Sequence, residues 1–156
     1  MCRKLLDSLG VLGRNGVLSE QSVYTADTMA LLCYLADRLP RRADEVFKKA
    51  EDEEAILVVP SIVLGEAIFT LLKGREIFGV KVPLEKLTTF LDVLETSMTV
   101  RLADLTVRGW HLITTINLPE LHDRIVVSTH LTLGSRAILT DDQEIQRLHG
   151  IRTIWT

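Results

Sequence analysis

The chain has 156 residues, of which 47% are hydrophobic and 25% are charged. This length is typical of one domain, and the hydrophobic fraction can build a core, which excludes an intrinsically disordered chain. The 18 basic and 21 acidic residues give a net charge of −3, which excludes a protein that holds nucleic acid through bulk positive charge.

Strands and helices are predicted to alternate after residues 1–22, which contain three glycines and are interpreted as an N-terminal extension. The next elements in chain order are a strand at 23–26, helices at 29–38 and 42–52, a strand at 56–59, and helices at 61–73 and 84–94. The last elements are a strand at 98–102, helices at 104–116 and 121–133, a strand at 137–139, a helix at 142–148 and a strand at 153–155. Ser61 and Asp104 are expected to cap their helices, and Gly74 and Gly134 to end theirs.

This alternation predicts one α/β domain over residues 23–156. Successive strands joined through helices form a mostly parallel central sheet with helices on both faces. No stretch approaches the roughly 18 apolar residues of a membrane span. The two cysteines, Cys2 and Cys33, cannot form a disulfide framework. We therefore expect a cytoplasmic protein without a membrane segment.

Acidic residues are predicted to gather at one edge of this sheet. Asp27 follows the first strand, Asp141 and Asp142 follow the fourth, Glu66 lies in the helix after the second, and Asp123 begins a late helix. Functional groups in parallel sheets collect at the carboxyl ends of the strands. Clustered carboxylates repel one another unless a cation neutralises them, and their oxygens suit Mg²⁺ or Mn²⁺. The pattern therefore indicates a site for a hard divalent cation.

Glu66 is the only charged residue between Pro60 and Lys73. A helix that is apolar nearly all round is expected to be buried, and a buried carboxylate needs a partner. No basic residue lies three or four positions from Glu66, so its partner is a distant basic residue, a hydrogen-bond donor or a metal ion. For Glu66 alone, a buried structural ion pair is the simpler interpretation.

Four segments carry a resemblance to a known family. They are Val-Tyr-Thr-Ala-Asp27-Thr28, Pro60-Ser-Ile-Val-Leu-Gly-Glu66, His122-Asp123-Arg124-Ile-Val-Val and Ile-Leu-Thr140-Asp141-Asp142. In this order, with these strands and helices, the chain resembles the PIN-domain ribonucleases from about residue 23 to its end. The most similar subgroup is that of the VapC-type toxins of prokaryotic toxin–antitoxin pairs. The resemblance implies a single PIN-like domain.

The resemblance also implies roles for individual residues. The implied metal ligands, which are also the implied catalytic residues, are Asp27, Glu66, Asp123 and Asp142. Asp141 competes with Asp142 for the last of these places. The residues expected to support ligands or to contact a phosphate are Thr28, Thr140, Asp141 and Arg124. Arg124 has the alternative of pairing with a carboxylate of the site, and each threonine that of an ordinary hydroxyl at a strand end.

The implied activity is Mg²⁺- or Mn²⁺-dependent endonucleolytic cleavage of single-stranded or loop RNA by metal-activated water. The expected partners are an RNA substrate, a second copy of the chain in a homodimer, and a small antitoxin protein. Two alternatives share the fold. One is an RNA-processing nuclease, and the other is a non-cleaving PIN domain that binds RNA or serves in assembly.

Three further features have two interpretations each. The basic residues expected to attract RNA are Arg38, Arg41, Arg42, Lys48, Lys49, Lys73 and Arg75, although such clusters are commonly solvated surface. His122 adjoins Asp123 and can help to position it, but it can also be an ordinary surface or core histidine. The apolar helix at 62–72 can face a partner or the core.

Overall fold

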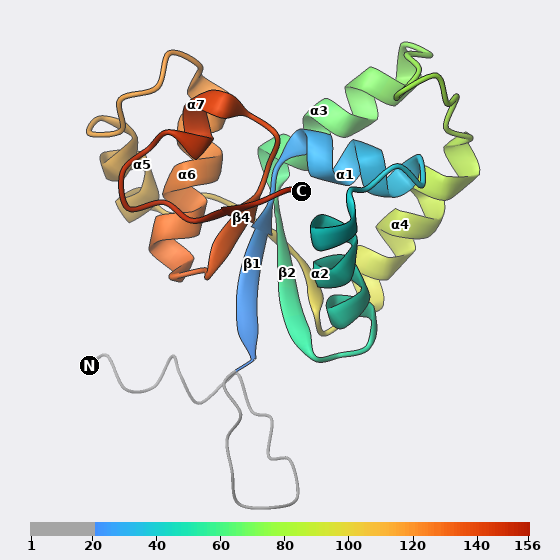
Figure 1. Ribbon diagram of the computed structural model, residues 1–156, viewed down its shortest axis with the longest axis horizontal. Helices are drawn as coiled ribbons and strands as arrows, with labels where there is room; N and C mark the ends of the chain where they lie inside the picture. Colours follow the sequence, from blue (N-terminus) through green and yellow to red (C-terminus); the bar gives the residue numbers. More distant parts are fainter. Residues whose placement is uncertain (1–20) are drawn as a thin grey trace, which may run out of the picture.

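Five parallel strands form the central sheet of the computed structural model, which describes residues 21–156 (Figure 1). They are β1 (Ser22–Ala26), β2 (Ala55–Pro60), β3 (Val100–Ala103), β4 (Ala137–Leu139) and β5 (Thr153–Ile154), in the spatial order β3-β2-β1-β4-β5. All four pairings in this sheet are parallel, as the alternation of elements predicts. Residues 1–20 of the predicted N-terminal extension lie outside the described residues, and Ser22 already belongs to β1.

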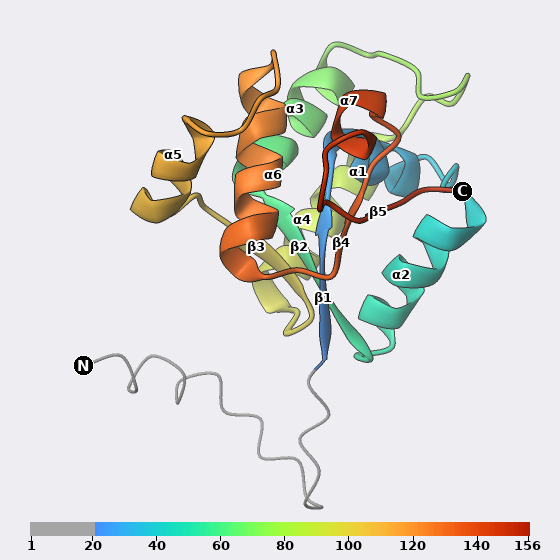
Figure 2. The same ribbon diagram turned by 60° about the vertical axis from the view of Figure 1, so that its left-hand side comes forward.

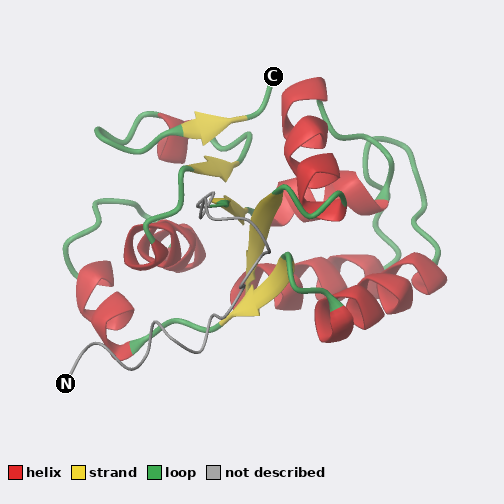
Figure 3. Cartoon of the chain, turned by 90° about the horizontal axis from the view of Figure 1, so that it is seen from below, coloured by secondary structure: helices red, strands yellow, loops and turns green. Residues whose placement is uncertain are grey.

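Seven helices in the described part of the chain connect and cover these strands. They are α1 (Thr28–Leu35), α2 (Arg41–Glu51), α3 (Ser61–Leu72), α4 (Leu84–Thr96), α5 (Val107–Ile113), α6 (Leu121–Leu133) and α7 (Gln143–Gln146). Helices α1, α2 and α4 lie on one side of the sheet, and α5 and α6 lie on the other (Figures 1 and 3). Helix α3 follows the end of β2 and packs against both α1 and α6 (Figure 2). The prediction of one α/β domain with helices on both faces is confirmed.

The two central strands owe their position to their apolar composition. Ala26 of β1 and Leu57 and Val59 of β2 are fully buried. A strand that is covered by helices on both faces buries alternate side chains in both directions, so a continuous apolar run suits the centre of a parallel sheet. The edge strand β3 is more exposed, since Leu102 on it faces solvent.

The register of the sheet brings three strand ends to the same edge. Ala26 at the end of β1 is paired with Leu139 at the end of β4, and Thr25 is paired with Val58 near the end of β2. Each of these strands leads directly into a polar segment or a helix. The residues that follow them therefore lie close together, although they are far apart in the sequence.

Two of the predicted helix caps are wrong. Thr106, not Asp104, caps α5, and its hydroxyl accepts a hydrogen bond from the Gly109 N–H at 3.1 Å. Helix α3 begins after Pro60, and no side chain caps it. The end of α6 agrees with prediction, because Gly134 adopts the left-handed conformation (φ +61°) that glycine tolerates best at a helix C-terminus.

Helix α3 is not buried all round, contrary to the expectation from its apolar sequence. Val63, Ala67 and Leu71 are buried, but Phe69 is 60% exposed and Leu72 is 64% exposed. One face of α3 packs on α1 and α6, and the opposite face is left to solvent because no further helix covers it in the described chain. Within residues 21–156, no helix is long and apolar enough to cross a bilayer.

Candidate metal and phosphodiester site

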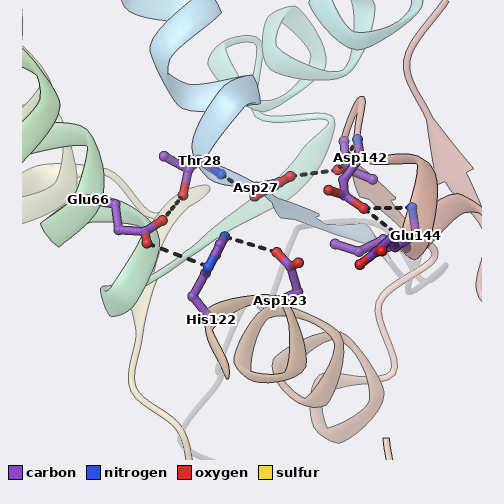
Figure 4. Close-up of polar contacts among 9 residues, drawn as sticks. Asp27, Thr28, Glu66, His122, Asp123, Asp142 and Glu144 are labelled. Atoms are coloured by element: carbon purple, nitrogen blue, oxygen red, sulfur yellow. Dashed lines mark hydrogen bonds and ion pairs between the residues drawn. The ribbon is translucent and has the colours of Figure 1, made fainter. Parts of the chain in front are cut away.

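Carboxylates from four different elements face one another at the carboxyl end of the sheet (Figure 4). Asp27 caps α1 directly after β1, Glu66 lies on α3, Asp123 lies in the first turn of α6, and Asp142 caps α7 after β4. The structure thus brings together the four acidic residues that the family resemblance implies as ligands. Hydroxyl and imidazole groups lie between them.

Asp27 is held by the two strands at the centre of the sheet. Its backbone N–H donates to the Leu139 carbonyl of β4 at 3.0 Å. One carboxylate oxygen accepts the Thr28 N–H, and the other accepts the Thr140 hydroxyl at 2.6 Å. Asp27 is only 4% exposed and Thr140 is fully buried. This carboxylate is therefore oriented by its surroundings before any ligand arrives.

Glu66 finds its partner outside its own helix, as expected. The Thr28 hydroxyl donates to Glu66 Oε2 at 2.7 Å, and His122 Nδ1 lies 3.6 Å from Glu66 Oε1. The side chain is 35% exposed, so the carboxylate borders solvent and is not part of a buried structural ion pair. Thr28 thereby links the start of α1 to α3, and its role in supporting a ligand stays a prediction.

His122 stands between two of the acidic groups. Its Nε2 is 2.9 Å from Asp123 Oδ1, while its Nδ1 faces Glu66. It is the one basic side chain within ion-pair distance of Asp27, Glu66, Asp123 or Asp142 among residues 21–156. The sequence indicated only that it adjoins Asp123. Its contact with Glu66 depends on the packing of α3 against α6, which no local pattern reveals.

The two adjacent acids after β4 have different local roles. The Thr140 hydroxyl accepts the Asp142 N–H at 3.0 Å, and Asp142 Oδ1 accepts the N–H groups of Glu144 and Ile145 at the start of α7. One oxygen of Asp142 is thus engaged in capping a helix. Asp141 and Asp142 both act electrostatically on the site, Asp141 on Asp27 and Asp142 on Asp123. The choice between them as the last ligand stays open.

The burial of these acids makes their ionised forms costly. The pKa of Asp123 is raised to about 6, chiefly by desolvation; His122 lowers this pKa, and the nearby Asp142, Asp27 and Glu120 raise it. Desolvation also raises the pKa of Asp27, against the opposing effect of its hydrogen bonds from Thr140 and Thr28. A cluster of partly desolvated carboxylates with one imidazole gains free energy from an added cation.

The chemistry of this donor set fits a hard divalent cation, since carboxylate oxygens predominate among its ligands. The present side-chain conformations do not yet form a ligand shell. Within the described residues, no three His, Cys, Asp or Glu side chains converge on one point that would hold a metal ion. Instead, hydroxyls and His122 separate the carboxylates. Asp27, Glu66, Asp123 and Asp142 are the residues that would hold such an ion.

Arg124 is oriented away from the acids by backbone contacts. Its Nε donates to the Leu118 carbonyl, and its Nη1 donates to the Ile113 carbonyl at 3.4 Å. It forms no ion pair with a carboxylate of the site, contrary to one of the two interpretations of its sequence position. In this structure it connects α6 to the end of α5 and the segment that follows. A contact with phosphate stays a prediction.

The fold is shared with bacterial toxin structures. The chain superimposes on a chain of VapBC2 from Rickettsia felis, crystallised with a DNA fragment from their promoter, with a TM-score of 0.61 over 86% of this chain and 99% of that one, at 14% identity. On a chain of DNA-bound VapBC from Salmonella typhimurium the TM-score is 0.63, over 86% of this chain and 98% of that one, at 15% identity. VapC20 from Mycobacterium tuberculosis is described as a Sarcin-Ricin loop cleaving toxin. Its chain gives a TM-score of 0.60, over 85% of this chain and 99% of that one, at 13% identity.

By sequence alone, the chain matches no known family and no curated protein. The structural likeness covers nearly the whole of each toxin chain, so the fold defined by β1 to β5 is the PIN-like fold of the VapC toxins. The resemblance stated from the sequence is confirmed at this level. At such low identities the likeness establishes the fold alone.

Proposed function

We propose that the protein is a Mg²⁺- or Mn²⁺-dependent endoribonuclease that acts as the toxin of a toxin–antitoxin pair. One observation carries the proposal: Asp27, Glu66, Asp123 and Asp142 come from four elements to one edge of a VapC-like fold. The description of VapC20 as a toxin that cleaves the Sarcin-Ricin loop supports RNA as the substrate class. The toxin role rests on the same structural likeness.

The contacts of the acids support this proposal. Thr140 orients Asp27, and Thr28 orients Glu66. His122 holds Asp123, and the raised pKa of Asp123 reflects a site where a cation is electrostatically favoured. When bound, a divalent cation neutralises phosphate charge and lowers the pKa of water, which is the chemistry of phosphodiester hydrolysis. No nucleophilic side chain is required for this reaction.

One observation favours a second candidate function. The described acids are separated by hydroxyls and by His122 and do not converge on a point. A PIN domain that binds RNA or serves in assembly without cleaving it would keep the fold with such a site. An RNA-processing nuclease is the remaining alternative, and it differs from a toxin in its biological partner and not in its chemistry.

The test is cleavage of a labelled single-stranded RNA by purified protein with Mg²⁺, with Mn²⁺ and with EDTA. The Asp27→Asn variant, purified identically, controls for contaminating ribonucleases. We expect cleavage that requires metal and falls at least about 100-fold in the variant. Equal cleavage by both proteins would contradict the proposal. Absence of cleavage by both, with Mn²⁺ binding shown by calorimetry, would favour the non-cleaving module.

The expected protein partners need separate experiments. We propose a homodimer and a small antitoxin, as the family resemblance implies, and the likeness to chains of VapBC complexes supports the antitoxin. Light scattering of the purified chain at about 100 µM tests the homodimer. A monomer at this concentration would contradict the proposed homodimer. The antitoxin is tested by asking whether a small gene lies next to the coding sequence and whether its co-expression rescues growth.

A further inference from the structure

The outer face of α3 presents an aromatic and a basic side chain in line with Glu66. Phe69 is three positions after Glu66 and Lys73 is seven, so the three side chains lie along one side of the helix. Along the axis, Phe69 is about 4.5 Å and Lys73 about 10 Å from Glu66, at about 1.5 Å per residue. The line begins at the proposed metal site and leads away from it. Glu66 is its inner end.

Phe69 and Lys73 contact each other and are open to solvent. The Lys73 ammonium lies over the Phe69 ring, 4.1 Å from its centroid. Phe69 is nevertheless 60% exposed, so much of the ring is free. An exposed phenylalanine gains little for folding, whereas a ring beside an ammonium offers a surface on which a base stacks and a cation for the adjoining phosphate.

The charge around this face favours an anionic ligand. Residues 73–81 contain three basic residues, Lys73, Arg75 and Lys81, and one acidic residue, Glu76. None of the three basic residues forms an ion pair with another residue in the 21–156 region. Their charges are therefore available to phosphate groups, which supply most of the affinity in nucleic-acid binding.

A cavity among the described helices does not have this character. It has a volume of about 640 Å³ and lies between α1, α2 and α4, where it is lined by four acidic residues and two lysines. Both lysines are already paired, Lys48 with Asp44 and Lys86 with Asp37. This cavity would repel a phosphate backbone. RNA is therefore expected to approach along α3 and not past this cavity beside α2.

We propose that Phe69 and Lys73 form a substrate-binding subsite for single-stranded RNA, in which a base next to the cleaved bond stacks on Phe69 and a phosphate contacts Lys73. This subsite rests on the proposed ribonuclease function, and it specifies which residues contact the RNA next to Glu66. A duplex end cannot present an unstacked base to Phe69, so the subsite selects single-stranded or loop RNA.

The experiment measures fluorescence anisotropy of a labelled 12-nucleotide single-stranded RNA of mixed sequence, with Mg²⁺. The Asp27→Asn protein is the parent, so that bound RNA is not consumed. Phe69→Ala, Phe69→Leu and Phe69→Trp are introduced into this parent. Leu133→Ala is the matched control, because Leu133 is an exposed apolar residue at the far end of α6 from Asp123. Circular dichroism verifies the folding of each variant.

We expect Phe69→Ala to raise Kd at least about 5-fold, the lower end of the effect of losing one stacked base. Phe69→Leu is expected to bind RNA as weakly as Phe69→Ala does, and Phe69→Trp is expected to bind RNA as tightly as the parent. Leu133→Ala should change Kd less than about 2-fold. Equal binding by the leucine variant and the parent would overturn the proposal, since it would indicate general apolar contact, such as that of a protein partner.

Lys73→Gln tests the phosphate contact, and Arg152→Gln is its control, because Arg152 is exposed and precedes β5 at the opposite edge of the sheet from the acids. The slope of log Kd against log salt concentration is expected to fall by about 0.7 for Lys73→Gln and to stay unchanged for Arg152→Gln. Equal slopes for the two variants, or no binding by the parent, would overturn the subsite. Cleavage by the wild-type protein, measured in parallel, is independent of these results. Metal-dependent cleavage with unchanged binding by the variants would refute the subsite and leave the proposed function standing.

Discussion

Replacing Asp123 with asparagine should stabilise the protein in the absence of metal. The Asp123 carboxyl is 4% exposed, and burial raises its pKa from 3.8 to about 6. A difference of about two units corresponds to about 3 kcal/mol at about 1.36 kcal/mol per unit. This pKa already includes the opposing effect of His122, so we expect Asp123→Asn to raise the free energy of unfolding by about 1–3 kcal/mol at pH 8.

The pH dependence of this effect has a defined sign. The folded-state pKa of Asp123 is raised, so the folded protein binds a proton more tightly than the unfolded chain between pH 3.8 and about 6. The wild-type protein therefore loses stability relative to Asp123→Asn as pH rises through this window. The difference between the two proteins is expected to be near zero at pH 3.5, to grow up to pH 6, and to stay constant above it.

Urea unfolding in EDTA, followed by tryptophan fluorescence at several pH values, measures this difference. Asp92→Asn is the control, because Asp92 is an exposed carboxylate on α4. Adding Mg²⁺ at about 100 times its Kd should stabilise the wild-type protein by about 2.7 kcal/mol and Asp123→Asn much less. No stabilisation of Asp123→Asn in EDTA, or a gain that does not vary with pH, would refute the reasoning that Asp123 is a desolvated member of an acidic cluster.

Three further predictions concern Thr140 at the site and two residues of α6, His130 and Arg124. Thr140→Val removes the hydroxyl between Asp27 and the Asp142 N–H, so RNA cleavage should fall at least about 10-fold, and an unchanged rate would show that Thr140 does not orient Asp27. Burial lowers the pKa of His130, which contacts Ser135 at 2.6 Å, so wild-type stability should fall as pH decreases below about 6.5. His130→Gln should lack that decrease in urea unfolding, and an identical pH profile would contradict the assignment. Arg124→Lys loses contacts to two backbone carbonyls, so its urea midpoint should fall by the equivalent of about 1–2 kcal/mol; loss of RNA affinity without loss of stability would instead support a phosphate contact.

Local patterns in the sequence determined most of the elements. The apolar run before Pro60 predicted β2, and Gly134 predicted the end of α6, because chain periodicity and backbone freedom act over a few residues. The cap of α5 was predicted wrongly at Asp104, since any of several polar residues before that helix can accept its first N–H groups. Which of them does so depends on where the chain leaves β3.

The acidic residues of the candidate site were also predictable, because parallel strands place the residues after their ends at one edge. Asp27 and Asp142 follow paired strands, and the register of β1 with β4 brings them together. The sequence did not reveal that α3 is open on one side. An apolar helix looks buried from its composition, and only the absence of a covering element in residues 21–156 leaves Phe69 exposed beside Glu66.

The contact of His122 with Glu66 is the clearest case of a feature that only the tertiary structure decided. Asp123 and His122 are neighbours in the sequence, but Glu66 is 56 positions before His122 and reaches it only because α3 packs on α6. The sequence by itself determined the strands, the helices and the acidic residues at the strand ends. The packing of helices then determined which hydroxyl or imidazole holds each acid, because a side-chain contact across elements depends on interaxial geometry that local sequence does not encode.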